Sequence, residues 1–416
     1  MRVCVVGSGG REHALAHVLG RGAEVVVTPG NPGIPGSVTT PPEGIEADLF
    51  VVGPEAPLVD GLADRLRARG ALVFGPGADG ARLEGSKGWM KSVLDRAGVP
   101  TARHGTFADV GPALAFLDTL DGLYVVKTDG LAAGKGVLVT DSRAEAAADV
   151  RAKLSGASFG EAGTTVVIEE GLTGPELSVL AVCDGTRAVP LPPAQDFKRV
   201  GDRGFGPNTG GMGAYSPVPA ASATLVDEVM VGAVEPTLHA LRAEGIDYRG
   251  VLYAGLMLTP EGLKVLEYNV RFGDPEAQVV LPRLASDLGE LLAGAAAGRL
   301  DSDPRFDPDP TVAVVCACEG YPAAPRVGDP IRGLADARAV SGVTLFLAGV
   351  GLDAEGRMVT AGGRVLAVSA TARTLLDARG RAYAAVDRLS WPGLVHRRDI
   401  ALDAAAPLAP AGEVSR

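Results

Sequence analysis

The chain of 416 residues is long enough for about three domains of ordinary size. Its 46% hydrophobic and 21% charged residues are typical of a globular protein and exclude global disorder. The 39 basic residues against 50 acidic ones give a formal net charge of −11, with no run of Lys or Arg, which argues against nucleic acid or an anionic membrane as a partner.

The sequence carries no sign of membrane insertion or export. Its longest apolar stretches, such as 342–352, are shorter than the roughly 18 residues that a membrane span needs. The N-terminus leads directly into a strand and a glycine turn, without the apolar region of a signal peptide. The four cysteines form no CxxC pair, which favours buried thiols in a reducing compartment. We expect a cytoplasmic protein that is a monomer or a weak homo-oligomer.

The first quarter of the chain predicts a doubly wound α/β unit, in which short buried strands alternate with helices. The first three apolar runs each end in a Gly or Pro turn. Ligands bind at the carboxyl ends of such strands, so these turns are expected to converge on one crevice. Strands are predicted at 2–6, 25–27, 49–52 and 72–74, and helices at 13–20, 62–68 and 87–96.

The connection at 33–47 is too rich in proline and glycine for the helix that a parallel crossover usually contains. Pro35, Pro41 and Pro42 disfavour a long helix, because proline lacks the N–H and clashes with the preceding turn. We therefore predict no α-helix of two turns or more between Val27 and Leu49.

The rest of the chain predicts an inserted α+β lid at about 104–172, a glycine-rich loop without regular structure at 195–217 and a Pro/Asp-rich linker at 301–310. A separate C-terminal domain is expected from Thr311. Strands are predicted at 124–127, 137–140, 165–170, 255–259 and 264–270, and helices at 143–154, 223–242 and 372–389.

The first glycine turn resembles a dinucleotide fingerprint but fails it. Gly7, Gly9 and Gly10 follow the first strand, yet Glu12 stands where GxGxxG requires its third glycine. The free amides at the helix start still favour an anion such as phosphate. An ordinary tight turn is the alternative interpretation.

A second glycine segment, KTDGLAAGKG, runs from Lys127 to Gly136 between two predicted strands. It is not a Walker loop, because three residues rather than four separate Gly130 from Gly134. Lys127 ends a buried strand and therefore needs an anionic partner, which a triphosphate would provide. A mobile surface hairpin is the alternative.

The strand at 264–270 carries polar residues on one face. With a period of two, Leu266, Tyr268 and Val270 face one side, whereas Glu267, Asn269 and Arg271 face the other. Such a face suits a metal–phosphate site, and hard oxygen ligands favour Mg²⁺. The alternative is a solvated face with an exposed Glu–Arg pair.

Together these segments resemble the phosphoribosylamine–glycine ligase family of ATP-grasp enzymes, which acts in purine synthesis. The resemblance covers Met1 to about Gly289 and resumes at Gly362. Its motifs are GSGGREHA, VVGPEAPL, LEGSKGWMK, KTDGLAAGKGV, QDFKRVGDRGFGPNTGGMGAYSP and LEYNVRFGDPEAQ.

The resemblance implies an α/β fold of ATP-grasp architecture, with an N-terminal doubly wound domain at 1–86, an ATP-grasp domain at 87–300 and a small C-terminal domain at 311–416. It implies ATP as co-substrate, glycine and 5-phosphoribosylamine as further small-molecule substrates, and Mg²⁺ or Mn²⁺ as the metal. The metal ligands so implied are Glu267 and Asn269, and the catalytic residues are Arg271, Lys127 and Lys135. The implied ATP-binding residues are Lys87, Lys127, Gly130, Gly134, Lys135, Gly136, Glu169, Glu170, Leu172 and Glu176. The implied substrate-binding residues are Gly9, Gly10, Arg11, Glu12, Asn31, Glu55, Asp196, Lys198, Asn208, Gly210, Gly211, Met212 and Asp274.

In the mechanism of that family, glycyl phosphate forms first and the amine of phosphoribosylamine then displaces its phosphate. Two other hypotheses are a different ATP-grasp ligase or carboxylase and a catalytically silent nucleotide-binding module. The sequence departs from the family pattern at Phe197, where a His is usual, at Gly204-Phe205, and in the shortened segment 33–47.

The loop at 130–136 is expected to be mobile without nucleotide and ordered with it, because glycines and alanines do not hold one conformation by themselves. Hydrogen exchange across 127–137 should therefore slow when ATP and Mg²⁺ are added. Unchanged exchange at saturating nucleotide would contradict this expectation.

Overall fold

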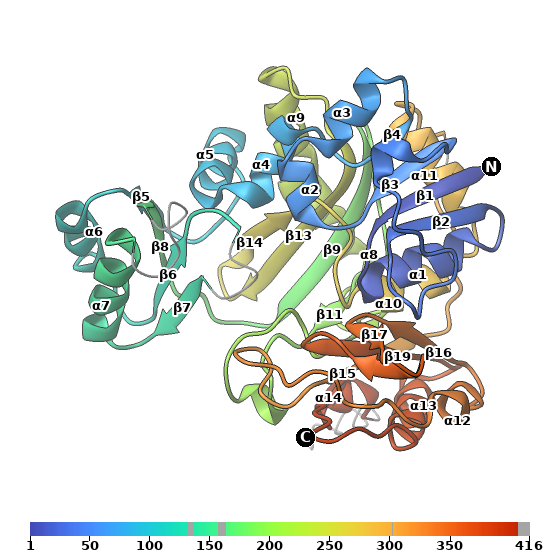
Figure 1. The fold of residues 1–416 in the computed structure, drawn as a ribbon. Coiled ribbons are helices and arrows are strands. Elements are labelled where there is room, and N and C mark those ends of the chain that lie inside the picture. The colour runs from blue at the N-terminus through green and yellow to red at the C-terminus, as the bar shows by residue number, and fades with distance from the viewer. Residues whose placement is uncertain (132–135, 157–163, 302, 407–416) are drawn as a thin grey trace, which may run out of the picture.

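The computed structural model describes residues 1–131, 136–156, 164–301 and 303–406. A parallel sheet near the N-terminus, an antiparallel central sheet, a projecting sheet with its own helices and a C-terminal sheet make up the molecule (Figure 1). None of the helices in these ranges is long and apolar enough to cross a membrane.

The N-terminal sheet has the strand order β2-β1-β3-β4. All of its strands are parallel, as predicted for a doubly wound unit. Its strands are β1 (Arg2–Gly7), β2 (Glu24–Pro29), β3 (Leu49–Val52) and β4 (Val73–Phe74). Its helices are α1 (Gly10–Leu19), α2 (Glu55–Val59), α3 (Leu62–Ala68) and α4 (Ala78–Gly85). Chain order reverses between β1 and β3, where a parallel sheet opens its ligand crevice.

The segment 33–47 contains only the 3₁₀ turn η1 (Pro42–Gly44), so the predicted absence of a two-turn helix is confirmed. The chain instead lies extended beside β2. The Val27 amide donates to the Gly36 carbonyl at 2.9 Å, and the Val38 amide donates to the Val27 carbonyl at 2.9 Å. Where a helix would usually cover the sheet, this proline-rich segment instead forms a short backbone pairing along the edge strand β2.

A four-stranded antiparallel sheet of order β5-β8-β6-β7 lies within residues 104–170 and projects away from the other sheets (Figure 1). Helices α6 and α7 pack on it around a small core of its own that includes Leu117, Val126, Val150 and Ile168. The bounds are β5 (His104–Phe107), α6 (Val110–Leu117), β6 (Tyr124–Thr128), β7 (Val137–Thr140), α7 (Arg143–Leu154) and β8 (Val166–Glu170). The strands of 124–140 and the helix of 143–154 are confirmed, whereas β5 and α6 were not predicted.

The central sheet has the order β10-β9-β13-β14 and is antiparallel. Its strands are β9 (Glu176–Asp184), β10 (Ala188–Pro190), β13 (Arg249–Thr259) and β14 (Gly262–Asn269). The remaining helices of this part are α5 (Lys87–Ala97), α8 (Ala223–Val229), α9 (Glu235–Ala243), α10 (Ala277–Val280) and α11 (Leu288–Ala296). The helix predicted over 223–242 is correct in extent, but Met230–Val234 between α8 and α9 is π-helical.

A register shift in β14 corrects the face predicted for Leu266. Gly255 pairs with Glu267, whereas the next residue of β13, Leu256, pairs with Val265. One residue of β14 is therefore extra, as in a β-bulge, and the alternation is interrupted there. Val265 and Tyr268 are buried in the core, while Leu266 is only half-buried.

The segment 195–217 was expected to lack regular structure, and this prediction was wrong. It supplies β11 (Gln195–Asp196) and β12 (Gly213–Ser216), which join β15 (Thr311–Ala317), β16 (Val343–Leu347) and β19 (Arg364–Thr371) in the order β11-β12-β15-β19-β16. The apolar strand β15 would otherwise expose unpaired backbone groups on one edge, and β12 covers that edge. The sheet of the C-terminal part therefore also includes two strands from the middle of the chain.

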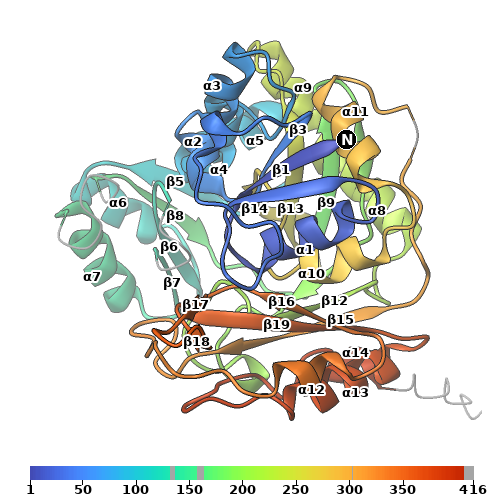
Figure 2. The same ribbon diagram turned by 45° about the vertical axis from the view of Figure 1, so that its right-hand side comes forward.

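The C-terminal sheet also packs against the N-terminal part. Helices α1 and α10 lie on one side of it, and α12 (Leu334–Arg338), α13 (Leu375–Val386) and α14 (Leu402–Ala405) lie on the other (Figure 2). The Leu347 amide donates to His13 Nδ1 at 2.8 Å, and burial lowers the pKa of His13 to about 4. The hairpin of β17 (Val350–Leu352) and β18 (Met358–Thr360) completes this end, and the predicted linker 301–310 contains no helix or strand where it is described. All four cysteines are buried, as predicted.

Candidate functional site

The polar face predicted for the end of β14 is present. Arg271 Nη2 donates to Asn269 Oδ1 at 3.1 Å, and the neighbouring Tyr268 and Val270 are buried on the opposite side. Glu267 lies on the same polar face, upstream of the other two. The alternation of this strand end therefore brings a carboxylate, an amide and a guanidinium together.

Glu267 is an ionised carboxylate among cations. Burial would raise its pKa, but Lys198, Lys127, Lys87 and Arg271 together lower the pKa below its ordinary value. Within the described ranges, no ion pair or hydrogen bond engages this carboxylate. Its oxygens are thus free to accept a metal ion or another cation.

The donor set at this point suits a hard divalent cation that retains water. Across the described residues, no three His, Cys, Asp or Glu side chains come close enough to hold a metal ion. Mg²⁺ needs few protein groups, since it keeps several waters and binds substrate phosphates as well. The Glu267 carboxylate and the Asn269 amide oxygen fit that requirement.

Arg271 connects the polar face to the N-terminal sheet. Its Nη2 lies 2.8 Å from Glu84 Oε1, and its Nε lies 3.3 Å from Glu55 Oε2. Burial opposes the charge, but Glu84 and Glu55 raise the pKa of Arg271 above its ordinary value. Glu84 was not predicted as a site residue, although it lies in the last turn of α4, three residues before the predicted Lys87.

A buried ion-pair cluster fixes Lys127. The Glu169 carboxylate lies 2.7 Å from Lys127 Nζ and 3.1 Å from Lys91 Nζ. Lys91 is fully buried and also donates to Thr101 Oγ1 at 2.6 Å. Burial lowers the pKa of Lys91 to about 8, despite the opposing effect of Glu169. The lysine predicted at the end of a buried strand therefore has an anionic partner within the protein itself.

The other residues predicted for ATP lie around this cluster. Lys87 Nζ donates to the Gly130 carbonyl at 2.9 Å, and the Thr128 amide donates to the Gly136 carbonyl at 2.8 Å. Glu170 Oε1 accepts from the Arg103 amide at 2.9 Å, and Leu172 is half-buried just after β8. Gly134 and Lys135 lie outside the described residues.

Acidic side chains gather where β9 meets β11. Lys198 Nζ lies 2.6 Å from Glu176 Oε2, and Asp196 and Glu176 help to raise the pKa of Lys198 even though burial opposes this. Burial raises the pKa of Asp196 to about 7, because Glu276, Glu176 and Glu267 add to the effect while Lys198 opposes it. Asp196 therefore changes charge near neutral pH.

The backbone of the first glycine turn binds the side chain of Glu12. The Gly9 amide donates to Glu12 Oε2 at 2.6 Å, and Arg11 Nε donates to Glu12 Oε1 at 2.6 Å. A Cβ on Gly7 or Gly53 would lie 2.5 Å or 2.1 Å from atoms of Glu12, so the turns after β1 and β3 do converge. This position explains why Glu12 replaces the third fingerprint glycine.

Asn31 is engaged by backbone groups. Its Nδ2 donates to the Ser8 carbonyl at 2.7 Å and to the Ala348 carbonyl at 3.0 Å, and its Oδ1 accepts from the Gly33 amide at 2.8 Å. It joins the second turn to the first turn and to the C-terminal sheet. Asn31 would therefore contribute to a ligand pocket by holding these backbone segments in place.

The segment 208–212 and Asp274 lie beside the C-terminal sheet. Arg364 Nη2 lies 2.9 Å from Asp274 Oδ2, and the Gly210 amide donates to Tyr321 Oη at 3.0 Å. Met212 is buried and bonds through its backbone to Phe197 and Val315, while Asn208 is half-buried and forms a bridge with Arg199. Arg364 was not predicted, because nothing in its local sequence sets it apart from other arginines.

Phe197 is held by packing. Its ring lies under the Arg397 guanidinium at 4.9 Å and against Tyr215 at 6.2 Å between ring centroids. The Arg397 side chain is buried, and a cation–π contact from which water is excluded stabilises by about 2 kcal/mol. The phenyl ring supplies no proton donor or acceptor at this position.

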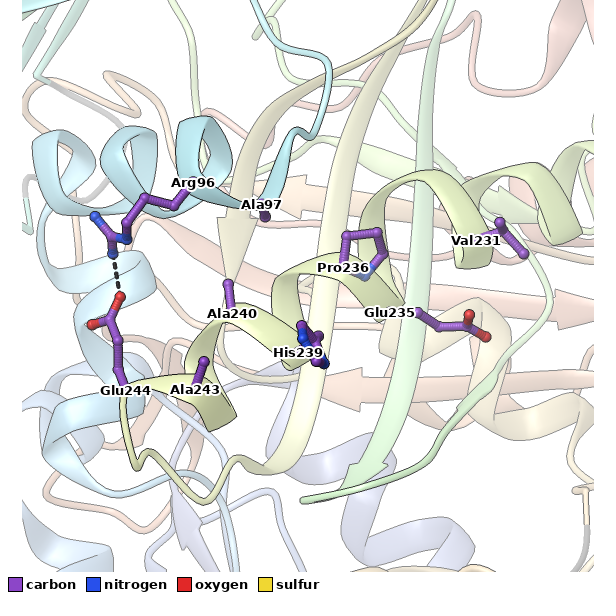
Figure 3. Close-up of a pocket in the computed structure, with 9 residues that line it drawn as sticks. All are labelled: Arg96, Ala97, Val231, Glu235, Pro236, His239, Ala240, Ala243 and Glu244. Atoms are coloured by element: carbon purple, nitrogen blue, oxygen red, sulfur yellow. Dashed lines mark hydrogen bonds and ion pairs between the residues drawn. The ribbon is translucent and has the colours of Figure 1, made fainter.

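A groove of about 510 Å³ lies elsewhere, between α5 and α9 (Figure 3). An ion pair between Arg96 and Glu244 closes one end of it, and Val231 is 66% exposed at the other end. None of its lining residues is a predicted site residue. The candidate site is the cluster of polar side chains around Glu267, Asn269 and Arg271, which lies apart from this groove.

Family models match nearly the whole chain. The phosphoribosylglycinamide synthetase N domain matches residues 1–84, its ATP-grasp (A) domain matches 85–277, and its C domain matches 311–403. A phosphoribosylamine–glycine ligase from Streptomyces coelicolor is 48% identical over 97% of this chain and 100% of its own length. A phosphoribosylamine–glycine ligase from Mesorhizobium japonicum is 46% identical over 98% of this chain and 99% of its own length.

Solved structures agree with these relatives. A phosphoribosylamine–glycine ligase from Thermotoga maritima superimposes with a TM-score of 0.83 at 36% identity, covering 96% of this chain and 100% of that one. An N5-carboxyaminoimidazole ribonucleotide synthetase from the same organism shares only the fold, with a TM-score of 0.62 at 17% identity over 95% of this chain and 99% of that one.

Proposed function

Because the chain belongs to the phosphoribosylglycinamide synthetase family and is therefore an ATP-dependent carbon–nitrogen ligase, we propose that it joins glycine to 5-phosphoribosylamine. The products would be glycinamide ribonucleotide, ADP and phosphate. We also propose that residues 1–86, 87–300 and 311–416 form its domains, with the lid at about 104–172. Mg²⁺ or Mn²⁺ would be its metal.

The observation that carries this proposal is the ionised Glu267 among cations from separate segments. Lys87, Lys127 and Lys198 lower its pKa from the start of α5, the end of β6 and the segment after β11. Phosphoryl transfer depends mainly on positioning and on neutralising the charge of the phosphate oxygens. A carboxylate for a metal and lysines for phosphate oxygens at one point meet both needs.

Arg271 supports placing both substrates in the same crevice. Its guanidinium spans from Asn269 on the proposed metal side to Glu55, which follows β3. Arg11 Nη1 lies 4.0 Å from the same Glu55 carboxylate and reaches the turn after β1. The proposed phosphate site and the proposed amine pocket are thus linked by one chain of ion pairs.

We assign the residues of this crevice as follows. Lys127, Lys87 and Arg271 neutralise the phosphate oxygens, Glu267 and Asn269 hold the metal, and Glu176 with the residues after β8 holds the nucleoside. The proposed substrate pocket consists of Gly9, Gly10, Arg11, Glu12, Asn31, Glu55, Asp196, Lys198, Asn208, Gly210, Gly211, Met212 and Asp274. The metal, when bound, would add positive charge at the β- and γ-phosphates.

The chemistry would proceed in two balanced steps. A carboxylate oxygen of glycine attacks the γ-phosphorus, the bond to the bridging oxygen breaks, and glycyl phosphate and ADP form. The amine of phosphoribosylamine then attacks the acyl carbon, the bond from that carbon to the phosphate oxygen breaks, and the departing phosphate takes up the proton that the amine loses. Because an acyl phosphate is readily hydrolysed, the crevice has to exclude water between the two steps.

Turnover with substrates omitted one at a time tests the proposal. ATP hydrolysis should require both glycine and phosphoribosylamine and should be near background with either one alone. Glycine labelled with ¹⁸O in its carboxylate should transfer one ¹⁸O to the released phosphate, which tests the glycyl-phosphate step. ATP turnover that responds to a different carboxylate would contradict the substrate assignment.

Asp196 gives the proposal a pH signature. If its carboxylate receives the ammonium group of glycine, binding needs the ionised form, which predominates above its pKa of about 7. The KM for glycine should therefore be about tenfold lower at pH 8 than at pH 6. Asp196→Asn should remove this dependence, and a pH-independent KM in the unaltered protein would contradict the assignment.

A further inference from the structure

Arg364, the first residue of β19, reaches out of the C-terminal sheet to two segments of the proposed pocket. Its Nη1 donates to the Gly210 carbonyl at 2.5 Å and to the Asp274 carbonyl at 2.9 Å. Its Nη2 donates to Asp274 Oδ2 at 2.9 Å. The Asp274 turn and the glycine segment at 210–211 thus share one guanidinium.

This contact fixes the Asp274 carboxylate on both oxygens. Arg364 takes Oδ2, and Gln278 Nε2 donates to Oδ1 at 2.7 Å. Asp274 Oδ2 lies 3.7 Å from the position of a Cβ on Gly9, so the carboxylate faces the first glycine turn. Arg364 and Arg11 lower the pKa of Asp274 against the effect of burial, which keeps the carboxylate charged.

The segment at 210–211 has a second contact with the same part of the C-terminal sheet. The Gly210 amide donates to Tyr321 Oη at 3.0 Å, and a Cβ on Gly363 would lie 2.3 Å from the Tyr321 ring. Gly211 has a φ of 108°, which side chains rarely adopt, and a Cβ there would lie 2.4 Å from Pro275. The segment therefore lies tightly between the Asp274 turn and Arg364.

The form of the side chain is important here. The Arg364 guanidinium presents its N–H donors in a fixed plane on separate nitrogens and donates to a carboxylate and two carbonyls at once, a pattern that the single tetrahedral nitrogen of a lysine does not match. The Arg364 side chain is only 22% exposed, so water screens these contacts weakly. Losing them would free both segments that line the pocket.

We propose that Arg364 is a positioning residue for the phosphoribosylamine pocket: it holds Asp274 and the 210–211 segment in the geometry that receives this substrate. It acts through these groups and not by touching the substrate. The inference rests on the proposed function. It adds a residue from the C-terminal sheet to a pocket built from the N-terminal turns and the central part of the chain.

Steady-state kinetics of Arg364→Met and Arg364→Lys test the proposal. The KM for phosphoribosylamine should rise about tenfold to a hundredfold in Arg364→Met, because hydrogen bonds to a charged group are lost. The KM for ATP should stay within about threefold of its original value, since Lys87, Lys127 and Glu267 do not contact Arg364. Arg364→Lys should show the same split with a smaller rise, because it retains the charge.

Arg357→Met is the matched control. Arg357 also belongs to the C-terminal part, but its ion pairs with Asp353 and Glu355 lie at the surface, and its side chain is 64% exposed. It should leave both KM values unchanged. Thermal unfolding shows whether Arg364→Met folds. If it does not, the test is whether Arg364→Lys raises the KM for phosphoribosylamine without raising the KM for ATP.

The outcomes separate this inference from the proposed function. A wild-type protein that ignores phosphoribosylamine would overturn both. A wild-type protein that uses it, with Arg364 variants whose KM for it is unchanged or whose two KM values rise together, would overturn the inference alone. A double variant tests the coupling of the two residues. Adding Arg364→Met to the Asp274→Asn protein should raise the KM for phosphoribosylamine by a smaller factor than adding it to the unaltered protein.

Discussion

Replacing Glu267 by glutamine is expected to lower kcat about 10²–10³-fold at saturating Mg²⁺ while the fold stays intact. The change keeps the shape of the side chain but removes the negative charge that Lys198, Lys127, Lys87 and Arg271 surround. A neutral amide is a poor ligand for a hard divalent cation, and the lysines would repel the metal without the carboxylate. Initial rates over a Mg²⁺ series, with thermal unfolding of the variant, measure the effect.

Glu261→Gln is the matched control for this variant. Glu261 lies in the turn that joins β13 to β14, in the same hairpin as Glu267, and it is exposed. Its replacement should leave kcat within about twofold, since surface changes away from the site have small effects. A near-normal kcat for Glu267→Gln at saturating Mg²⁺ would contradict the metal assignment.

Replacing Lys91 by methionine is expected to destabilise the protein by about 3 kcal/mol. The Lys91 ammonium and the Glu169 carboxylate are both buried, and their separation is 3.1 Å. Methionine fills the space, but one oxygen of a buried carboxylate loses its cationic partner, and only Lys127 remains to compensate the charge. Urea unfolding monitored by circular dichroism measures the loss.

An exposed ion pair of the projecting part, to which Glu169 belongs, provides the comparison. Arg143 lies 2.7 Å from Asp118, and the two side chains are 36% and 63% exposed. Arg143→Met should cost less than about 1 kcal/mol, because water screens such a pair. A loss for Lys91→Met as small as that of Arg143→Met would show that the buried cluster does not stabilise the fold.

The elements that carry the proposed chemistry could be predicted from the pattern of residues close together in the sequence. The apolar runs of β1 and β3 and the alternation around Asn269 follow from side-chain periodicity alone, so these parts were predicted correctly. The absence of a helix at 33–47 followed from proline chemistry in the same way. Such features depend on residues close together in the sequence.

The errors came from contacts between distant segments. β12 pairs with the edge of β15, a strand about a hundred residues further along the chain. That partner cannot be recognised from the local sequence, so 195–217 was predicted as an irregular loop. The bulge in β14 at Leu266 depends on its pairing with β13. Lys91 and Arg364 gain their importance only from the partners that the fold brings to them, Glu169 and Asp274. No spacing within the sequence indicates those contacts.

The most direct test of the proposed function is mass detection of the product. Purified protein with ATP, Mg²⁺, ¹⁵N-glycine and freshly prepared phosphoribosylamine should yield a species with the mass of labelled glycinamide ribonucleotide, together with equal amounts of ADP and phosphate. Formation of that species should cease when any one substrate is omitted. ADP release without it, from protein that is folded and binds ATP, would contradict the account.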